Sequence, residues 1–171
     1  ANFDFAKEDT TLAKTNVEKA EAALKAAQTS GDKSIIDGAT KTLENAKAEL
    51  EKYSAFWADI ESIDLTKGDA ASGANLVAAA GCTACHSIKS AGFEPAMDDK
   101  SASEAYGVAP PDLSNMGYLY DGKFLAALIK DPAMALKVTH KFNDTNPFPM
   151  TAFYGAGGDL NQEIADLVAY F

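Results

Sequence analysis

The first 64 residues carry an apolar pattern that leaves few folds open to them. Apolar side chains recur at alternating spacings of four and three over residues 13–27, and again over residues 36–60. This heptad spacing is typical of helices that pack along a narrow seam. The seam residues are Ala13, Val17, Ala20, Leu24 and Ala27 in the first stretch and Ile36, Ala39, Leu43, Ala46, Leu50, Tyr53, Trp57 and Ile60 in the second.

A glycine-containing connection, "TSGD" at residues 29–32, lies between the two stretches. Such a connection suits a tight turn between helices. We therefore predict an antiparallel helical hairpin over residues 1–64, with arms of roughly 30 Å or more at about 1.5 Å per residue. Its alanine-rich seam buries little area, so the hairpin alone should be only marginally stable. The aromatic end of its second arm (Tyr53, Phe56 and Trp57) should dock either on the same chain or on a partner.

Residues 65–171 have a different composition, since all six prolines lie there and short helical patterns alternate with loops. Helices are predicted over residues 67–81, 120–132 and 157–171. Acidic residues mark their first turns, and no alternating strand pattern of useful length appears. The predicted fold class is all-α, with a helical hairpin followed by a second domain at 65–171.

The predicted helix ends rest on a few polar residues. Asp69 suits the dipole of the first helix, and Asp121 is a candidate N-cap of the second. Asp131 and Pro132 should close that second helix. Asp159 with Gln162 resembles a capping box for the last helix. The "GAGGD" stretch at 155–159 follows no strand and is therefore read as a loop, not a phosphate site.

The formal net charge is −10, and all fifteen basic residues are lysines. This composition excludes a basic patch for nucleic acid, and it permits a cationic protein partner or simply keeps the protein soluble. No apolar run approaches the roughly 20 residues of a membrane span. No signal peptide opens the chain, and "EIADLVAYF" stops inside a helical pattern, so we expect a processed or trimmed piece of a longer protein.

The only two cysteines lie in "CTACH", with Cys82, Cys85 and His86 in one turn. A thioredoxin-type pair would need a βαβ setting, which the sequence lacks. A zinc site would need four ligands, and besides these three residues the chain offers only the distant His140. Catalytic Cys–His chemistry lacks a third group to hold the base. The C-x-x-C-H pattern instead predicts covalent attachment of one haem, with two thioethers and a histidine ligand.

Four landmarks in order, "GD…G…CTACH", "PPDL", "FPMTAF" and "EIADLVAYF", resemble the class I c-type cytochromes from Lys67 onward. The resemblance implies that Cys82 and Cys85 hold the haem and that His86 is its proximal ligand. It also implies that Pro111, in a Pro-x-Leu pattern with Leu113, offers its carbonyl to the other ring nitrogen of His86.

The same resemblance places Gly73 and Tyr170 where the first and last helices of the family cross. One extra residue between Asp69 and Cys82 could shift that crossing. The segment at 89–109 is longer than usual in the family, and the sequence assigns it no role.

A narrower resemblance rests on "YGVAPPDLS", "THKFND" and "PMTAFYGAGGD…EIADLVAYF". These stretches resemble the first haem domain of a membrane-anchored dihaem cytochrome c subunit of a bacterial quinol–cytochrome c reductase. That family implies a periplasmic location, an anchor before Ala1 and a second haem domain after Phe171. It also implies an iron–sulfur protein as electron donor and a cytochrome as acceptor.

The sixth ligand has several candidates. Met150 follows Pro149 and precedes the last helix at about the family distance, so we expect it to bind the iron. His140 is the competitor, whereas Met97 and Met116 lie near the proximal side in sequence and Met134 suits core packing. The expected function is single-electron transfer with His/Met ligation, without catalysis. The alternatives are a haem-based sensor or enzyme accessory domain with an exchangeable ligand, or a hairpin that serves as the primary interaction module.

Overall fold

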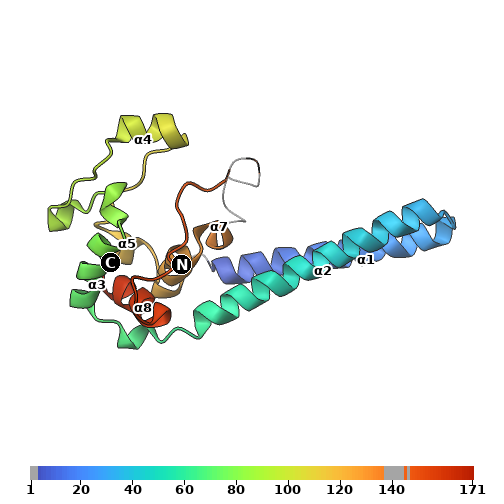
Figure 1. The fold of residues 1–171 in the computed structure, drawn as a ribbon. Coiled ribbons are helices and arrows are strands. Elements are labelled where there is room, and N and C mark those ends of the chain that lie inside the picture. The colour runs from blue at the N-terminus through green and yellow to red at the C-terminus, as the bar shows by residue number, and fades with distance from the viewer. Residues whose placement is uncertain (1–3, 137–144, 146) are drawn as a thin grey trace.

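The computed structural model describes residues 4–136, 145 and 147–171, and its regular structure is helical (Figure 1). Within these residues one isolated antiparallel bridge joins Ile88 and Phe93, and no β-strand forms. The predicted all-α fold class is therefore confirmed. None of the helices in the described ranges combines the length and the apolar character that crossing a membrane requires.

The N-terminal region is the predicted hairpin, formed by α1 (Phe5–Ser30) and α2 (Lys33–Glu61), which project as a long arm in Figure 1. Gly31 ends α1 with a φ of 69°, a left-handed conformation that glycine adopts without strain. Asp32 then caps α2 by accepting a hydrogen bond from the Ser34 amide at 2.9 Å. The seam of α1 is buried at alanines 13, 20 and 27, as the heptad spacing predicts.

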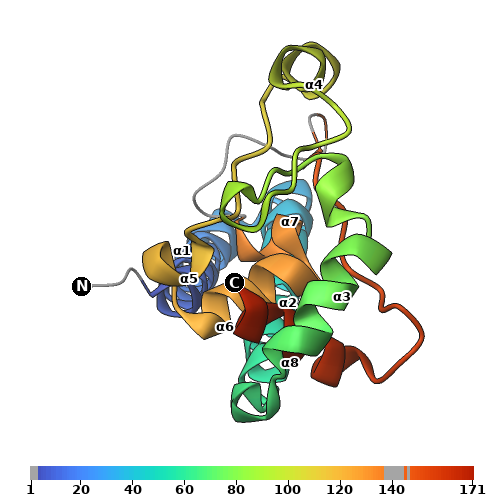
Figure 2. The same ribbon diagram turned by 90° about the vertical axis from the view of Figure 1, so that its left-hand side faces the viewer.

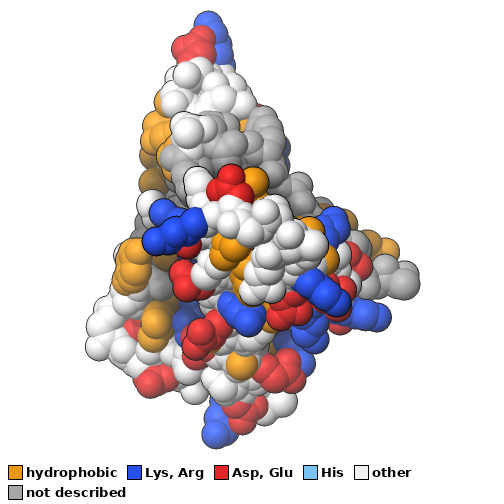
Figure 3. All heavy atoms as spheres, turned by 90° about the vertical axis from the view of Figure 1, so that its right-hand side faces the viewer, with side chains coloured by type: hydrophobic (Ala, Val, Ile, Leu, Met, Phe, Trp, Pro, Cys, Tyr) orange, Lys and Arg blue, Asp and Glu red, His pale blue; other side chains and the backbone are white. Residues whose placement is uncertain are grey.

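The base of the arm packs on its own chain. Trp57, Ile60 and Ile63 lie in the same hydrophobic cluster as residues of the C-terminal region. Phe5 stacks on Phe124, with ring centroids 4.2 Å apart. The aromatic end of α2 therefore docks within the molecule. Towards the tip of the arm, Lys side chains lie beside Asp and Glu side chains on the surface (Figure 3).

The C-terminal region gathers short helices around this base (Figures 1 and 2). Three of the elements are single 3₁₀ turns. The elements are η1 (Leu65–Lys67), α3 (Ala70–Ala79), η2 (Cys82–Ala84), η3 (Lys89–Ala91), α4 (Asp99–Tyr106), α5 (Met116–Leu119), α6 (Gly122–Lys130), α7 (Pro132–Ala135) and α8 (Leu160–Tyr170).

Helices α3 and α8 cross with their backbones in contact. A Cβ atom at Gly73 would lie 2.1 Å from the Asp166 carbonyl oxygen and 2.8 Å from the Tyr170 Cβ. A Cβ at Gly68 would lie 2.2 Å from the Ala165 carbonyl oxygen. Only glycine allows this approach. The expected meeting of Gly73 and Tyr170 is confirmed, in spite of the extra residue before Cys82.

The acidic residues at the helix starts are N-caps, with three corrections. Asp69 was expected in the first turn of a helix over 67–81, but it caps α3, which begins at Ala70. Asp69, Asp121 and Asp159 each accept a hydrogen bond from the amide three residues ahead, at 2.7–2.9 Å. The capping box is half wrong, because the Gln162 side chain donates to the Lys67 carbonyl and to Asp166 instead of returning to the cap. Asp131 does end α6, but it also caps α7, which follows at once.

Candidate functional site

The two cysteines lie on one tight turn that directly follows α3. Gly81, with a φ of 73°, leads into it, and the Cys82 carbonyl accepts hydrogen bonds from the amides of Cys85 at 3.3 Å and His86 at 2.9 Å. Residues three apart in such a turn project from the same side, so both thiols serve one edge of a flat ligand. Both cysteines are free and half-buried, and burial raises the pKa of the Cys82 thiol.

The His86 ring is oriented by a backbone carbonyl. Its Nδ1 lies 2.7 Å from the Pro111 carbonyl oxygen. Because a carbonyl only accepts, Nδ1 must carry the proton and donate, which leaves Nε2 with a free lone pair for a metal. This is the hydrogen bond that the resemblance implies for Pro111.

Asp112 holds the Pro111 segment beside the turn that carries the two cysteines. Its carboxylate accepts from the Ser87 hydroxyl at 2.5 Å, from the Lys89 amide at 3.2 Å and from the Ser114 amide at 2.9 Å. Hydrogen bonds from Ser114 and then Ser87 hold the pKa of Asp112 far below its usual value. The Leu113 amide adds a bond to the Ser87 carbonyl at 2.9 Å. Sequence reasoning missed Asp112, although an Asp two residues before a Ser is a local turn signal.

The long segment at 89–109 turns back over the cysteine turn. Its Ala96 and Met97 amides donate to the carbonyls of Thr83 and Ala84, the two residues between the cysteines, at 3.2 and 3.3 Å. The segment then continues into α4, which stands away from the other helices (Figures 1 and 2). Its first half therefore satisfies backbone groups of the turn, a role that the sequence did not reveal.

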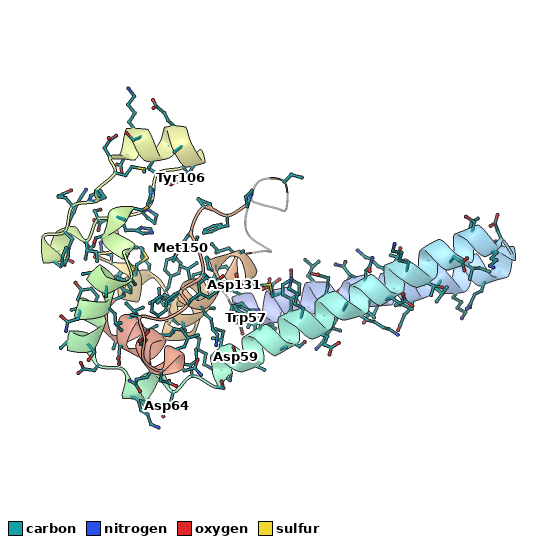
Figure 4. All side chains as sticks on the ribbon, in the orientation of Figure 1. Trp57, Asp59, Asp64, Tyr106, Asp131 and Met150 are labelled. Atoms are coloured by element: carbon teal, nitrogen blue, oxygen red, sulfur yellow. The ribbon has the colours of Figure 1, made fainter. Side chains whose placement is uncertain are left out.

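The candidate sixth ligands lie in different surroundings. Met134 is buried and packs with Ala13 and Tyr53, so its predicted core role is confirmed. Met116 is buried in α5, whereas Met97 and Met150 are half-buried. In the view of Figure 4, Met150 lies between α3 and α7. His140 lies outside the described residues.

The family model for cytochrome c matches residues 70–171. The chain belongs to the cytochrome c family. Membership implies a covalently bound c-type haem and a role in electron transfer, not catalysis. Domains of this family are typically periplasmic or extracellular. Comparison with curated proteins and with solved structures gave no match.

Proposed function

We propose that Cys82 and Cys85 hold a haem c through thioethers, that His86 and Met150 bind its iron, and that the protein passes single electrons. The observation that carries the proposal is the 2.7 Å contact between His86 Nδ1 and the Pro111 carbonyl. It fixes the tautomer and the ring orientation that leave Nε2 available to a metal.

The residues present fit a covalently attached haem. Two free thiols share one turn, the adjacent imidazole is already oriented, and Leu113 adds a half-buried apolar side chain that packs against the core cluster. Bound haem supplies a one-electron iron couple. Its potential depends on the axial ligands, and a thioether ligand such as Met150 favours the reduced iron and raises the potential.

Met150 is the methionine best suited to the sixth position. Met134 is occupied in the cluster at the base of the hairpin, and Met116 is buried in α5. The Met97 amide is tied to the turn that carries the cysteines. Met150 is half-buried on an irregular segment that leads to α8, where no helix constrains its side chain.

A second function, a haem-based sensor or an enzyme accessory domain, would need an exchangeable sixth ligand. Nothing in the site favours it over electron transfer, because a thioether is at hand in Met150. Binding of carbon monoxide to the reduced protein at neutral pH separates the two. A closed His/Met iron should bind it poorly, whereas an exchangeable ligand would let it bind readily.

The narrower setting is also a proposal, supported by the resemblance of "YGVAPPDLS" and "PMTAFYGAGGD" to the dihaem subunit of a bacterial quinol–cytochrome c reductase. In that setting the protein is periplasmic, is anchored to the membrane by a segment outside this chain, and carries one haem in this domain. An iron–sulfur protein donates the electron and a cytochrome accepts it. The net charge of −10 would favour encounter with a cationic partner.

The test of the ligand set compares Met150→Ala with His140→Ala in the loaded protein. Met150→Ala should abolish the weak near-infrared sulfur-to-iron band of the oxidised protein, lower the potential and open the iron to carbon monoxide. His140→Ala should leave all three properties nearly unchanged. Acid-acetone should extract haem from neither variant, because the Cys82 and Cys85 thioethers remain. If His140→Ala alone opens the iron, the ligation is bis-histidine and the proposal is wrong.

A further inference from the structure

Glu163 is a buried carboxylate that the proposed function does not use. It lies in the first turn of α8 with 8% of its surface exposed. Its two oxygens each accept one backbone hydrogen bond from the preceding loop, Oε2 from the Ala156 amide and Oε1 from the Gly158 amide, both at 2.6 Å. A buried carboxylate is tolerated only with such partners, so the loop and the side chain depend on each other.

The loop at 155–158 is shaped around this carboxylate. Gly155 and Gly157 have φ values of 96° and 111°, which other residues adopt only with strain. A Cβ at Gly158 would lie 2.6 Å from Glu163 Oε1. The glycine-rich "GAGGD" stretch thus forms a set of amides that binds an anion of its own chain. Its sequence resemblance to a phosphate loop reflects the same backbone chemistry.

The loop ends the segment that carries Met150. Met150 lies six residues before Ala156, and residues 151–155 form no helix or strand. The Phe153 amide donates to the Ile129 carbonyl of α6 at 3.0 Å, which fixes one point of the segment. The Phe153 side chain also packs against the core cluster. The bonds from the Ala156 and Gly158 amides to Glu163 hold the chain at a further place, between Phe153 and the start of α8.

We propose that Glu163 is a positioning residue for the Met150 thioether, acting through the 155–158 loop. This inference rests on the proposed function, in which Met150 is the sixth ligand. Loss of the Glu163 attachment should leave the haem in place and let the Met150 segment swing away from the iron more often. A small ligand that competes for the sixth position should then bind more tightly.

Asp166 provides a matched control on the same helix. It is 7% exposed and accepts hydrogen bonds from the Asp69 amide and from Gln162 Nε2, both at 2.8 Å. It therefore resembles Glu163 in burial and in number of bonds, but it holds the start of α3 and not the Met150 segment. A purely structural role for Glu163 would make the two residues equivalent.

The experiment titrates imidazole into the oxidised, haem-loaded protein and records the near-infrared band and the melting temperature. In Glu163→Gln the amide can accept one of the two bonds but faces the other amide with a donor. Because a hydrogen bond to a charged group is worth enough to change an equilibrium about tenfold, imidazole should bind about tenfold more tightly than to wild type. Asp166→Asn should lose comparable thermal stability, with imidazole affinity within about twofold of wild type.

Gly158→Ala tests the same contact from the loop side, without a change of charge, and serves if Glu163→Gln does not fold. Its Cβ would displace the Glu163 carboxylate, so tighter imidazole binding is again expected. If Glu163→Gln binds imidazole no more tightly than wild type does, the inference is overturned. The same holds for Gly158→Ala when that is the variant measured. A wild type that lacks the band, or a Met150→Ala variant that keeps it, overturns the proposed Met150 ligation itself and the inference with it.

Discussion

The hairpin and the C-terminal region bring their helices together in opposite ways. Helices α1 and α2 meet along a long seam in which α1 buries alanines 13, 20 and 27, and a Cβ at Gly38 in α2 would touch nothing within 4 Å. Helices α3 and α8 instead meet at a crossing where Gly73 of α3, and Gly68 just before α3, lie against the backbone of α8. The first contact is long and tolerant, whereas the second is short and allows no added atom.

This difference indicates that the geometry of the candidate site depends on the crossing of α3 and α8. The turn with the cysteines follows α3 directly, and the loop held by Glu163 precedes α8, so the crossing fixes both sides of the candidate site. The outer arm, residues 17–49 of the hairpin, makes no contact with that site among the described residues. The last turns of α2 pack against the C-terminal region, because Trp57 and Ile60 belong to its hydrophobic core. The border predicted at residue 64 therefore cuts through a shared cluster.

The largest expected effect comes from cutting the chain at that border. A chain that begins at Leu65 loses Trp57, Ile60 and Ile63, each nearly fully buried. At about 1.5–3 kcal/mol per buried side chain, the free energy of unfolding should fall by roughly 5–9 kcal/mol. The haem should stay attached, since Cys82 and Cys85 remain. Denaturant unfolding of the two proteins measures the loss, and a loss below about 1 kcal/mol would show that the base is not part of the core.

A pair of glycine substitutions sharpens the comparison between the two ways of packing. Gly73→Ala should destabilise the protein by about 3 kcal/mol or more, because its Cβ would overlap the Asp166 carbonyl. Gly38→Ala should stabilise the arm by about 0.5–1 kcal/mol, the gain in helix propensity at an open site. Denaturant unfolding monitored by haem absorbance and by helical circular dichroism would separate the two effects. Equal effects of the two substitutions would remove the distinction.

A smaller effect is expected at a hydrogen bond that joins α1 and α2 at the base of the hairpin. Trp57 Nε1 donates to the buried Asp9 carboxylate at 3.1 Å. Trp57→Phe keeps a six-membered aromatic ring at this position and removes the donor, so the free energy of unfolding should fall by about 1–3 kcal/mol. The melting temperature measures it, and Phe56→Leu, which alters a neighbouring half-buried ring without touching this bond, is the control. If the control costs as much as Trp57→Phe, ring packing and not the hydrogen bond would account for the loss.

Local patterns predicted much of this fold. The heptad spacing gave the hairpin, and acidic residues at 69, 121 and 159 marked three helix starts correctly. The helix α4 was missed, because its eight residues "DKSASEAY" include only Ala102, Ala105 and Tyr106 as apolar residues, which is too short a pattern to mark a helix in sequence. Only the Asp159 half of the capping box forms, because the Gln162 side chain donates to the Lys67 carbonyl, which is distant in sequence, and to Asp166 one turn further on.

The candidate site, like the fold, was predictable in part from the sequence. The residues of "CTACH" and Pro111 follow from motif and family resemblance, and the His86–Pro111 contact is present. Asp112 and Glu163 do not follow from the motif or the resemblance. The turn signal at Asp112 predicts only its bond to Ser114, whereas its bonds to Ser87 and Lys89 and those of Glu163 depend on groups placed by the fold. A carboxylate that binds loop amides looks in sequence like any acidic residue of a helix or turn.

Among the described residues, the outer arm contributes nothing to the haem site, whereas the base of the hairpin contributes to the core. Replacing residues 17–49 by a short glycine–serine loop removes the arm and keeps Phe5, Asp9, Ala13, Tyr53, Trp57 and Ile60. The near-infrared spectrum of the oxidised, haem-loaded protein is the direct test. We predict a sulfur-to-iron band with the position and intensity of the intact chain. Loss or displacement of that band would contradict the account, because it would show that the arm helps to hold Met150 on the iron.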